Sequence, residues 1–295
     1  METKKTPKGV CSGFLMPHPP IIVQAVGKGR ERDAAATVAA CKRVADRIAE
    51  LAPETIVVIS PHSPLFSDFL FIHDKPILSG SFETFGAPEA RLSVPQDGPY
   101  REVFQKKLDK AGIPAGSIDI TQIKRYGLAD GLDHGVLVPL TFIFAAYSAC
   151  NLVALSSSAF EGETLTRCGA FLAEAAFETG RRVCVIASGD MSHRVSSASP
   201  YGKAEEGAKF DHRIQKAIEA SDLKAIRAID RAFREKAGEC GYNSLVMALA
   251  AMERAAALEY PDAPPEVTGS VFSYEAPFGI GYCVAEFGFS GEEAV

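Results

Sequence analysis

Three short, continuous apolar segments constrain the fold more than any other feature of the sequence. They are Thr55–Ser60 (TIVVIS), Asn151–Ser156 (NLVALS) and Arg182–Ser188 (RVCVIAS), and each is rich in Val, Ile or Leu. A strand buried on both faces of a sheet has this composition, whereas a half-exposed strand alternates apolar and polar residues. We therefore predict that these segments are central strands of a sheet that helices cover on both faces.

Helical patterns fill the intervals between these strands. We expect helices over Glu31–Leu51, Tyr100–Ala111, Val136–Cys150, Glu163–Gly180, Ala204–Ile229 with a break near Ser221, and Gly241–Ala257. The last quarter of the chain adds a closing strand pair, Glu266–Tyr274 and Gly281–Phe289. Strands that alternate with helices are typical of α/β proteins. We predict a single α/β domain, residues 1–295, with a mostly parallel but mixed central sheet flanked by helices.

Composition narrows the function classes. The chain has 295 residues, of which 47% are hydrophobic and 23% charged, so it can bury a full core without disulfides. Its net charge of -6 and the lack of a basic stripe argue against a nucleic-acid partner. Its seven scattered cysteines include no CxxC pair, which indicates a reducing cytoplasm rather than a secreted, disulfide-linked protein.

One uncharged stretch, Gly135–Leu155, is long enough for a membrane span. Pro139 near its start and Asn151 within it favour a core helix followed by a buried strand instead. Near the N-terminus, Pro17 ends the apolar stretch Phe14–Met16 too early for a signal peptide. We therefore expect a cytoplasmic protein with no membrane partner.

Four of the six histidines lie in turns beside predicted strands or helices. They are His18 in LMPHPP, His62 in SPHSP, His134 in LDHG and His193 in SGDMSHR. Any one of them could be an ordinary surface or hydrogen-bonded core histidine. However, ligands collect at the carboxyl ends of strands in open α/β sheets. If the strands before His18, His62 and His193 are parallel neighbours, their imidazoles share one pocket at that end of the sheet.

A metal site built on these imidazoles would need a further ligand. Two histidines and one carboxylate form the ligand set of non-haem Fe(II) oxygenases. Among the carboxylates in turns we choose Glu239 in AGECGY, which precedes an apolar helix, although a helix-start carboxylate is an equally good interpretation. The adjacent Cys240 competes with it, because a thiolate suits softer ions such as Zn or Cu(I). The other candidates are Asp190, Asp133 and Asp68.

These residues lie in segments that resemble the class III extradiol ring-cleavage dioxygenases, of the LigB-like catalytic-subunit type, and the related Memo-like proteins. The matching segments are FLMPHPPIIV with VGKGRE, VVISPHSPLF, GLDHGVLVPL, IASGDMSHR, ECGYNSLVMAL and SYEAPFGIGYCVAEF. They follow the family's order and span almost the whole chain. The resemblance implies an α/β core with an iron pocket at one end of the strands.

The resemblance also implies roles for individual residues. His18, His62 and Glu239 correspond to the Fe(II) ligands, His193 to an acid/base histidine outside the coordination shell, and His134 to a histidine that contacts substrate and oxygen. The implied reaction opens a small aromatic ring, of the catechol or aminophenol type, with O2. We expect a homo-oligomer, and the resemblance leaves open a separate small accessory subunit, which some relatives require.

Two other functions remain open from the sequence. Cys240-Gly241 also resembles the ligand region of Memo-like proteins, so the chain could be a metal-binding redox or interaction protein that cleaves no catechol. The same ligands with His193 as base would also serve a zinc hydrolase. No role is assigned to His73 or His212. Several aromatic residues could line a pocket or simply pack in the core: Tyr126, Tyr201, Tyr242, Phe66 and Phe278.

Overall fold

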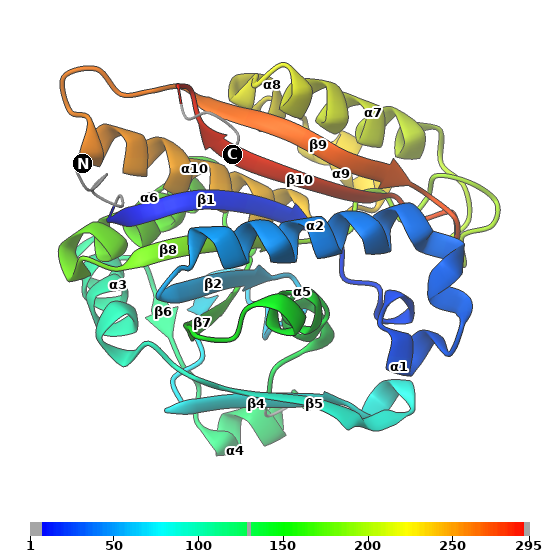
Figure 1. Ribbon diagram of the computed structural model, residues 1–295, viewed down its shortest axis with the longest axis horizontal. Helices are drawn as coiled ribbons and strands as arrows, with labels where there is room; N and C mark the ends of the chain where they lie inside the picture. Colours follow the sequence, from blue (N-terminus) through cyan, green and yellow to red (C-terminus); the bar gives the residue numbers. More distant parts are fainter. Residues whose placement is uncertain (1–7, 129–130, 292–295) are drawn as a thin grey trace.

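The centre of the protein is a six-stranded sheet (Figure 1). The computed structural model describes residues 8–128 and 131–291. Across the sheet the strands follow the order β7 (Asn151–Ser156), β2 (Thr55–Ser60), β8 (Arg182–Ser188), β1 (Gly9–Met16), β10 (Tyr282–Phe289) and β9 (Val267–Glu275). The three apolar segments of the sequence therefore form neighbouring strands with the predicted bounds.

Strand direction divides this sheet into two parts. β1, β8, β2 and β7 are parallel, with Leu15 opposite Ala187 and Ile59 opposite the same residue from the other side. β10 runs antiparallel to β1, and β9 antiparallel to β10. The prediction of a mixed sheet with a closing strand pair is confirmed. Because β1, β8 and β2 are parallel neighbours, their carboxyl ends meet at one edge of the sheet.

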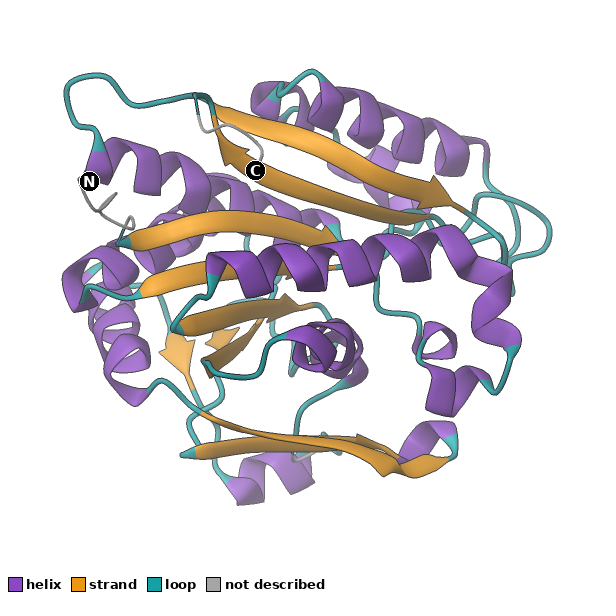
Figure 2. Cartoon of the chain, viewed as in Figure 1, coloured by secondary structure: helices purple, strands orange, loops and turns teal. Residues whose placement is uncertain are grey.

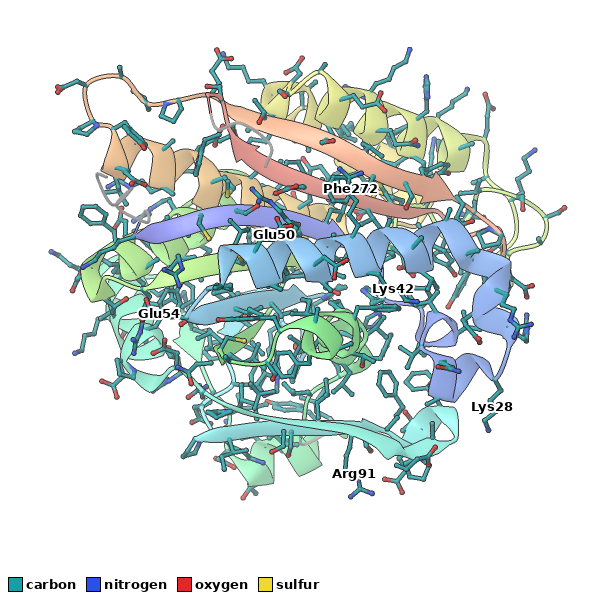
Figure 3. All side chains as sticks on the ribbon, in the orientation of Figure 1. Lys28, Lys42, Glu50, Glu54, Arg91 and Phe272 are labelled. Atoms are coloured by element: carbon teal, nitrogen blue, oxygen red, sulfur yellow. The ribbon has the colours of Figure 1, made fainter. Side chains whose placement is uncertain are left out.

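Helices cover both faces of the sheet (Figure 2). α2 (Ala35–Leu51) and α5 (His134–Ala146) lie on one face, and α6 (Gly162–Thr179) and α10 (Tyr242–Glu259) lie on the other. Successive residues of β2 point to opposite faces, so Ile56 packs with the first pair of helices and Val57 with the second. Charged side chains such as Lys42 and Glu50 project from the outer side of α2 (Figure 3).

The remaining helices complete these layers. The predicted break near Ser221 separates α7 (Glu205–Glu219) from α8 (Leu223–Arg227), and Ser221 has a positive φ of 53°. The helix expected from Glu31 begins with a 3-10 turn, Arg30–Ala34, before α2. The helix predicted over Tyr100–Ala111 is α3 (Gly98–Lys110). Three short helices lie outside the predicted ranges: α1 (Gln24–Gly27), α4 (Ile120–Arg125) and α9 (Arg231–Ala237).

A hairpin outside the main sheet has no counterpart among the elements predicted from the sequence. β4 (Ile77–Phe82) and β5 (Ala87–Pro95) pair antiparallel and pack against α5. Their turn is a 3-10 helix, Glu83–Phe85, and much of β5 is exposed, so it lacks the apolar run that marks the central strands. The short strands β3 (Leu70–Phe71) and β6 (Ala115–Gly116) form a separate parallel pair.

The long uncharged stretch forms α5 and β7, as predicted. Within residues 8–128 and 131–291, no helix combines the length and the apolar character needed to cross a bilayer.

Candidate metal centre

The loops after β1, β2 and β8 and the start of α5 bring four histidines together. Nε2 of His18 lies 3.0 Å from Nε2 of His62. The ring centroid of His134 is 4.0 Å from that of His62 and 5.4 Å from that of His18. On the other side of the cluster, Nε2 of His193 lies 3.6 Å from Sγ of Cys240. The order of the parallel strands thus produces the juxtaposition that their sequence led us to expect.

Cys240 completes a set of three donor atoms. Its Sγ lies 3.7 Å from Nε2 of His18, and the donors of His18, His62 and Cys240 all lie within 4.8 Å of one another. Two metal–nitrogen bonds of about 2.1 Å that meet at a right angle place their nitrogens about 3.0 Å apart. The observed separation of the two imidazoles therefore fits a single ion. In the described part of the chain, this is the one such group of His, Cys, Asp or Glu.

The neighbouring Glu239 is engaged elsewhere. Its Oε2 accepts a hydrogen bond of 2.7 Å from the backbone N–H of Tyr242, in the first turn of α10. Its Oε1 lies 3.6 Å from Nη1 of Arg234. These contacts match the helix-start interpretation of this carboxylate. The structure therefore brings Cys240, and not Glu239, beside the two imidazoles.

Asp190 ties two donor residues to the loop after β8. Its Oδ1 accepts a hydrogen bond of 3.0 Å from the backbone N–H of His18. Its own backbone N–H donates to Sγ of Cys240 at 3.3 Å. Asp190 is buried, at 5% exposure. The carboxylate of Asp190 therefore fixes the main chain of His18, and its backbone N–H holds the sulfur of Cys240.

Asp133 has a similar role on the other side of the cluster. Its two carboxylate oxygens accept hydrogen bonds of 2.6 Å from the hydroxyls of Ser60 and Ser63, which flank His62 in sequence. It also caps α5 by accepting a hydrogen bond of 2.8 Å from the backbone N–H of Gly135. Asp133 thereby links the loop that carries His62 to the helix that His134 begins. The last candidate carboxylate, Asp68, is exposed.

Loss of hydration within the cluster favours the neutral form of all four imidazoles, even though only His18 is fully buried. It lowers the pKa of His18 well below its usual value, and the neighbouring histidines lower it further. Burial also lowers the pKa of His62, of His193 and, to about 4, of His134. Neutral imidazole is the form that offers a lone pair to a metal. For Cys240, burial and then the charges of nearby carboxylates raise the pKa of the thiol, and a bound cation would favour its thiolate.

Two aromatic rings flank the histidines on the solvent side. Tyr201 stacks on His193, with ring centroids 5.3 Å apart and planes 24° from parallel. Phe85, from the turn of the β4–β5 hairpin, meets His134 edge-on at 5.3 Å. Tyr201 was a candidate from the sequence. Phe85 was not, because the hairpin that carries it has no clear sequence signal.

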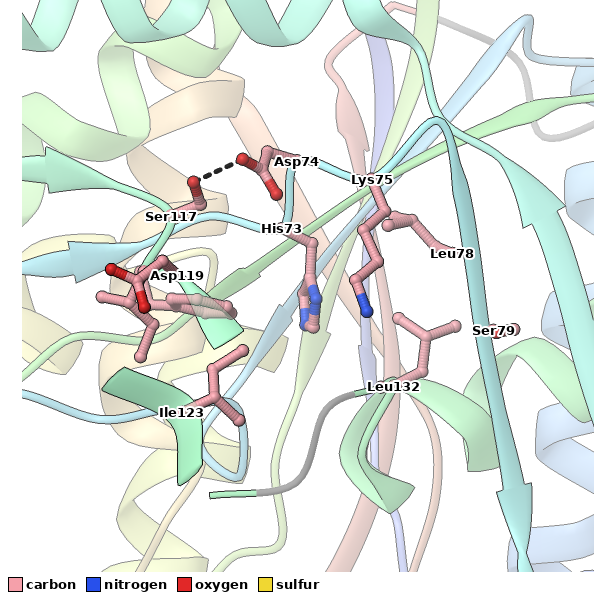
Figure 4. Close-up of a pocket in the computed structure, with 12 residues that line it drawn as sticks. His73, Asp74, Lys75, Leu78, Ser79, Ser117, Asp119, Ile123 and Leu132 are labelled. Atoms are coloured by element: carbon pink, nitrogen blue, oxygen red, sulfur yellow. Dashed lines mark hydrogen bonds between the residues drawn. The ribbon is translucent and has the colours of Figure 1, made fainter. Parts of the chain in front are cut away.

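The protein has two cavities of about 400 Å³ each, of which one reaches the cluster at Cys240. The first opens onto Cys240 and is also lined by Pro61, beside His62, and by residues of α9. The second lies between β4 and α4, and Figure 4 shows His73 and Lys75 pointing into it. His73, which received no role from the sequence, thus lines a cavity distinct from the histidine cluster.

Comparison with known proteins identifies the family. A family model for the catalytic LigB subunit of aromatic ring-opening dioxygenases matches residues 12–285. The chain belongs to the LigB family. The matched segment includes all four clustered histidines and Cys240. This membership places the chain in a dioxygenase-like superfamily whose enzymes are typically metal-dependent, in keeping with the His, His and Cys group.

The LigB-family chain also resembles three curated proteins. Protein CA_C1420 of Clostridium acetobutylicum is 31% identical over 271 residues, which are 92% of this chain and 56% of that protein. MEMO1 family proteins of Methanosarcina mazei and Methanosarcina acetivorans are each 26% identical, over 156 and 167 residues. These alignments cover 48% and 50% of this chain and 54% and 58% of the two archaeal proteins. The chain spans about half the length of the curated relatives it matches.

Proposed function

We propose that this LigB-family protein is a non-haem Fe(II)-dependent extradiol dioxygenase that opens a catechol-type or aminophenol-type ring with O2. The observation that carries the proposal is the convergence of three donor atoms with two further imidazoles beside them. Three protein donors leave positions on an iron ion for a substrate and for O2. Family membership supports the same class of reaction.

We propose His18, His62 and Cys240 as the ligands. The sequence offered Glu239 or Cys240 as the third donor, and we favour Cys240 because its sulfur faces both imidazoles while the Glu239 carboxylate contacts Tyr242 and Arg234. Metal binding would require the thiolate form of the cysteine, and thiolate sulfur binds iron in haem and iron–sulfur proteins as well as the softer ions Zn and Cu(I). When bound, a ferrous ion would supply the redox chemistry that lets O2 react with an aromatic ring.

The remaining two imidazoles would handle protons and orient the substrate. His193 is neutral and partly exposed, so its ring can accept a proton from a phenolic hydroxyl and return it later in the reaction. His134 would donate or accept a hydrogen bond to the bound substrate or oxygen. The edge of Phe85 beside His134 offers an aromatic substrate an apolar contact.

Anaerobic loading with Fe(II), followed by oxygen-electrode measurements across a panel of catechols and aminophenols, tests the proposal. We expect substrate-dependent O2 uptake together with loss of the aromatic ring, and neither with the Zn(II)-loaded protein. Stoichiometric iron without O2 uptake would contradict the proposal. Tight Cu(I) binding in that case would favour a Memo-like redox protein, and hydrolysis by the Zn(II) form would favour a zinc hydrolase.

A further inference from the structure

α5 contains a proline in its interior, and the gap that it leaves is filled from the histidine cluster. Pro139 is the sixth residue of the helix and is buried. Proline has no N–H, so the carbonyl of the residue four positions earlier, Gly135, has no helical donor. Gly135 is also buried. A buried carbonyl of this kind needs a partner from outside its helix.

Ser188, the last residue of β8, provides that partner. Its hydroxyl donates to the carbonyl oxygen of Gly135 at 2.5 Å. Having donated its one proton, Ser188 Oγ can only accept from the ring of His18, whose Nδ1 lies 2.9 Å away. Nδ1 of His18 therefore carries the ring proton. The lone pair of His18 is then on Nε2, which faces His62 Nε2 at 3.0 Å and Cys240 Sγ at 3.7 Å.

We propose that Pro139 is a positioning residue for the metal centre, acting on His18 through Gly135 and Ser188. By withholding an N–H, it keeps the Gly135 carbonyl available to Ser188, and the Ser188 hydroxyl in turn sets the tautomer and the orientation of the His18 ring. The inference rests on the ligand set of the proposed function. It explains why a helix-disrupting residue is placed inside a helix that is otherwise well formed.

Packing around Gly135 keeps its carbonyl in place. A Cβ at this position would lie 2.3 Å from Oγ of Ser60 and 2.9 Å from Oδ1 of Asp133, so a side chain would push α5 away from the end of β2. The backbone N–H of Gly135 is held by the Asp133 carboxylate. Its two main-chain polar groups are thus fixed by Asp133 on one side and Ser188 on the other.

Metal affinity gives the first test, measured by anaerobic competition titration of the metal-free protein with Fe(II) and, separately, with Zn(II). Ser188→Ala should lower the affinity for both ions by about 10- to 100-fold, as expected when a ligating histidine loses the partner that orients its ring. Pro139→Ala should lower both affinities by about 2- to 10-fold. The restored N–H competes with Ser188 for the Gly135 carbonyl, but the effect is smaller because that oxygen has a second lone pair. Wild-type affinity in Pro139→Ala would overturn the proposal.

A double variant shows whether the two residues act along one path. If they do, adding Pro139→Ala to Ser188→Ala should produce no further loss of affinity. Fully additive losses would overturn the proposal. Pro99→Ala is the matched control, because Pro99 lies in the first turn of α3, where a proline displaces no helical hydrogen bond. It should leave the affinity of both ions unchanged.

Two readouts separate this role from simple destabilisation and from the proposed reaction. Pro139→Ala removes a helix breaker, so its melting temperature should equal or exceed that of the wild type although it binds metal less tightly. Nitrogen-15 NMR of the metal-free protein should show the Nδ1–H tautomer of His18 in the wild type and its partial loss in Ser188→Ala. An Nε2–H tautomer in the wild type would overturn the proposal. Neither readout depends on ring cleavage, so a wild type that takes up no O2 would refute the proposed function alone.

Discussion

The histidine cluster has two halves that differ in how they are held. The buried half consists of the loops after β1 and β8 with Cys240; in it His18 is only 2% exposed, while His193 and Cys240 are partly exposed. The open half consists of the loop after β2 and the start of α5, and in it His62 is exposed and His134 partly exposed. The two halves therefore differ in access to solvent, although each contributes to the donor set, His18 and Cys240 from the buried half and His62 from the open half.

The hydrogen bonds that hold the two halves also differ. In the buried half, the loop after β8 exchanges backbone hydrogen bonds with the turn between β9 and β10, from Met191 to the carbonyl of Gly281 and from Gly281 to the carbonyl of Ser192, each of 2.8 Å. A buried carboxylate, Asp211, accepts the N–H of Ser192 from behind. In the open half, the hydroxyls on either side of His62 converge on one carboxylate, Asp133.

The largest difference between the two halves should appear when the two histidines that are not proposed ligands are replaced in turn. We expect His193→Ala to lower kcat by about 10²- to 10⁴-fold, the usual contribution of a proton-transferring side chain, while keeping its metal. His134→Ala should lower kcat by about 2- to 12-fold, which corresponds to the loss of one neutral hydrogen bond. Steady-state kinetics with metal analysis checks both. Loss of iron from His193→Ala would contradict its place outside the coordination shell.

The next largest effect should distinguish Cys240 from its neighbour. Cys240→Ala should weaken metal binding by more than about 100-fold, because loss of a ligand exceeds loss of an outer partner. Glu239→Gln should retain the metal and lose about 0.3–1 kcal/mol of stability, the usual effect of a charge at a helix start. Metal titration and urea unfolding measure the two quantities. The reverse pattern of metal loss would make Glu239 the third ligand.

Stability should depend on pH through the carboxylate beneath the buried half. Burial raises the pKa of Asp211 from 3.8 to about 7, although Ser192 and Tyr274 donate hydrogen bonds to it. The folded protein then holds a proton that the unfolded chain releases. Asp211 should therefore lower stability as pH rises from about 4 to about 7, by at most about 1.4 kcal/mol per pH unit.

Urea unfolding across this pH range, compared between the wild type and Asp211→Asn, isolates that contribution. The variant should show the shallower decline with pH, because its side chain does not titrate. Equal slopes in the two proteins would mean that the folded state binds no extra proton at Asp211.

The smallest effects should come from the two flanking rings. Tyr201→Ala should lower kcat by about 2- to 10-fold, which corresponds to the free energy of one aromatic pair. Tyr201→Phe keeps the ring and should restore kcat. The stack on His193 is held by Ser199, whose hydroxyl donates to the His193 carbonyl and accepts from the Tyr201 N–H. Phe85→Ala, beside His134, should act mainly on KM. Equal effects on kcat in the two variants would mean that the ring beside His193 and the ring beside His134 do not act differently.

Much of the fold could be predicted because burial on both faces leaves a clear record in sequence. The runs at Thr55–Ser60, Asn151–Ser156 and Arg182–Ser188 are strands with those bounds. The hairpin Ile77–Pro95 was missed because it buries only part of its surface and its strands lack a continuous apolar run. The expected homo-oligomer and the lack of a nucleic-acid partner stay predictions.

Only those parts of the candidate site that follow the ends of the central strands could be predicted. His18, His62 and His193 follow parallel neighbours, so sequence position and strand order together place them in one cluster. The sequence does not show which way a side chain points at the start of a helix. That direction determines whether Glu239 or Cys240 lies beside the two imidazoles. The contacts of Asp133 with Ser60 and Ser63 likewise depend on which loops meet.

X-ray absorption spectroscopy at the iron edge of the anaerobically Fe(II)-loaded protein tests the central claim most directly. We predict one sulfur scatterer at a bond length of about 2.3 Å beside nitrogen or oxygen neighbours, and its loss in Cys240→Ser. A wild-type spectrum with nitrogen and oxygen scatterers alone would contradict the His18, His62 and Cys240 centre.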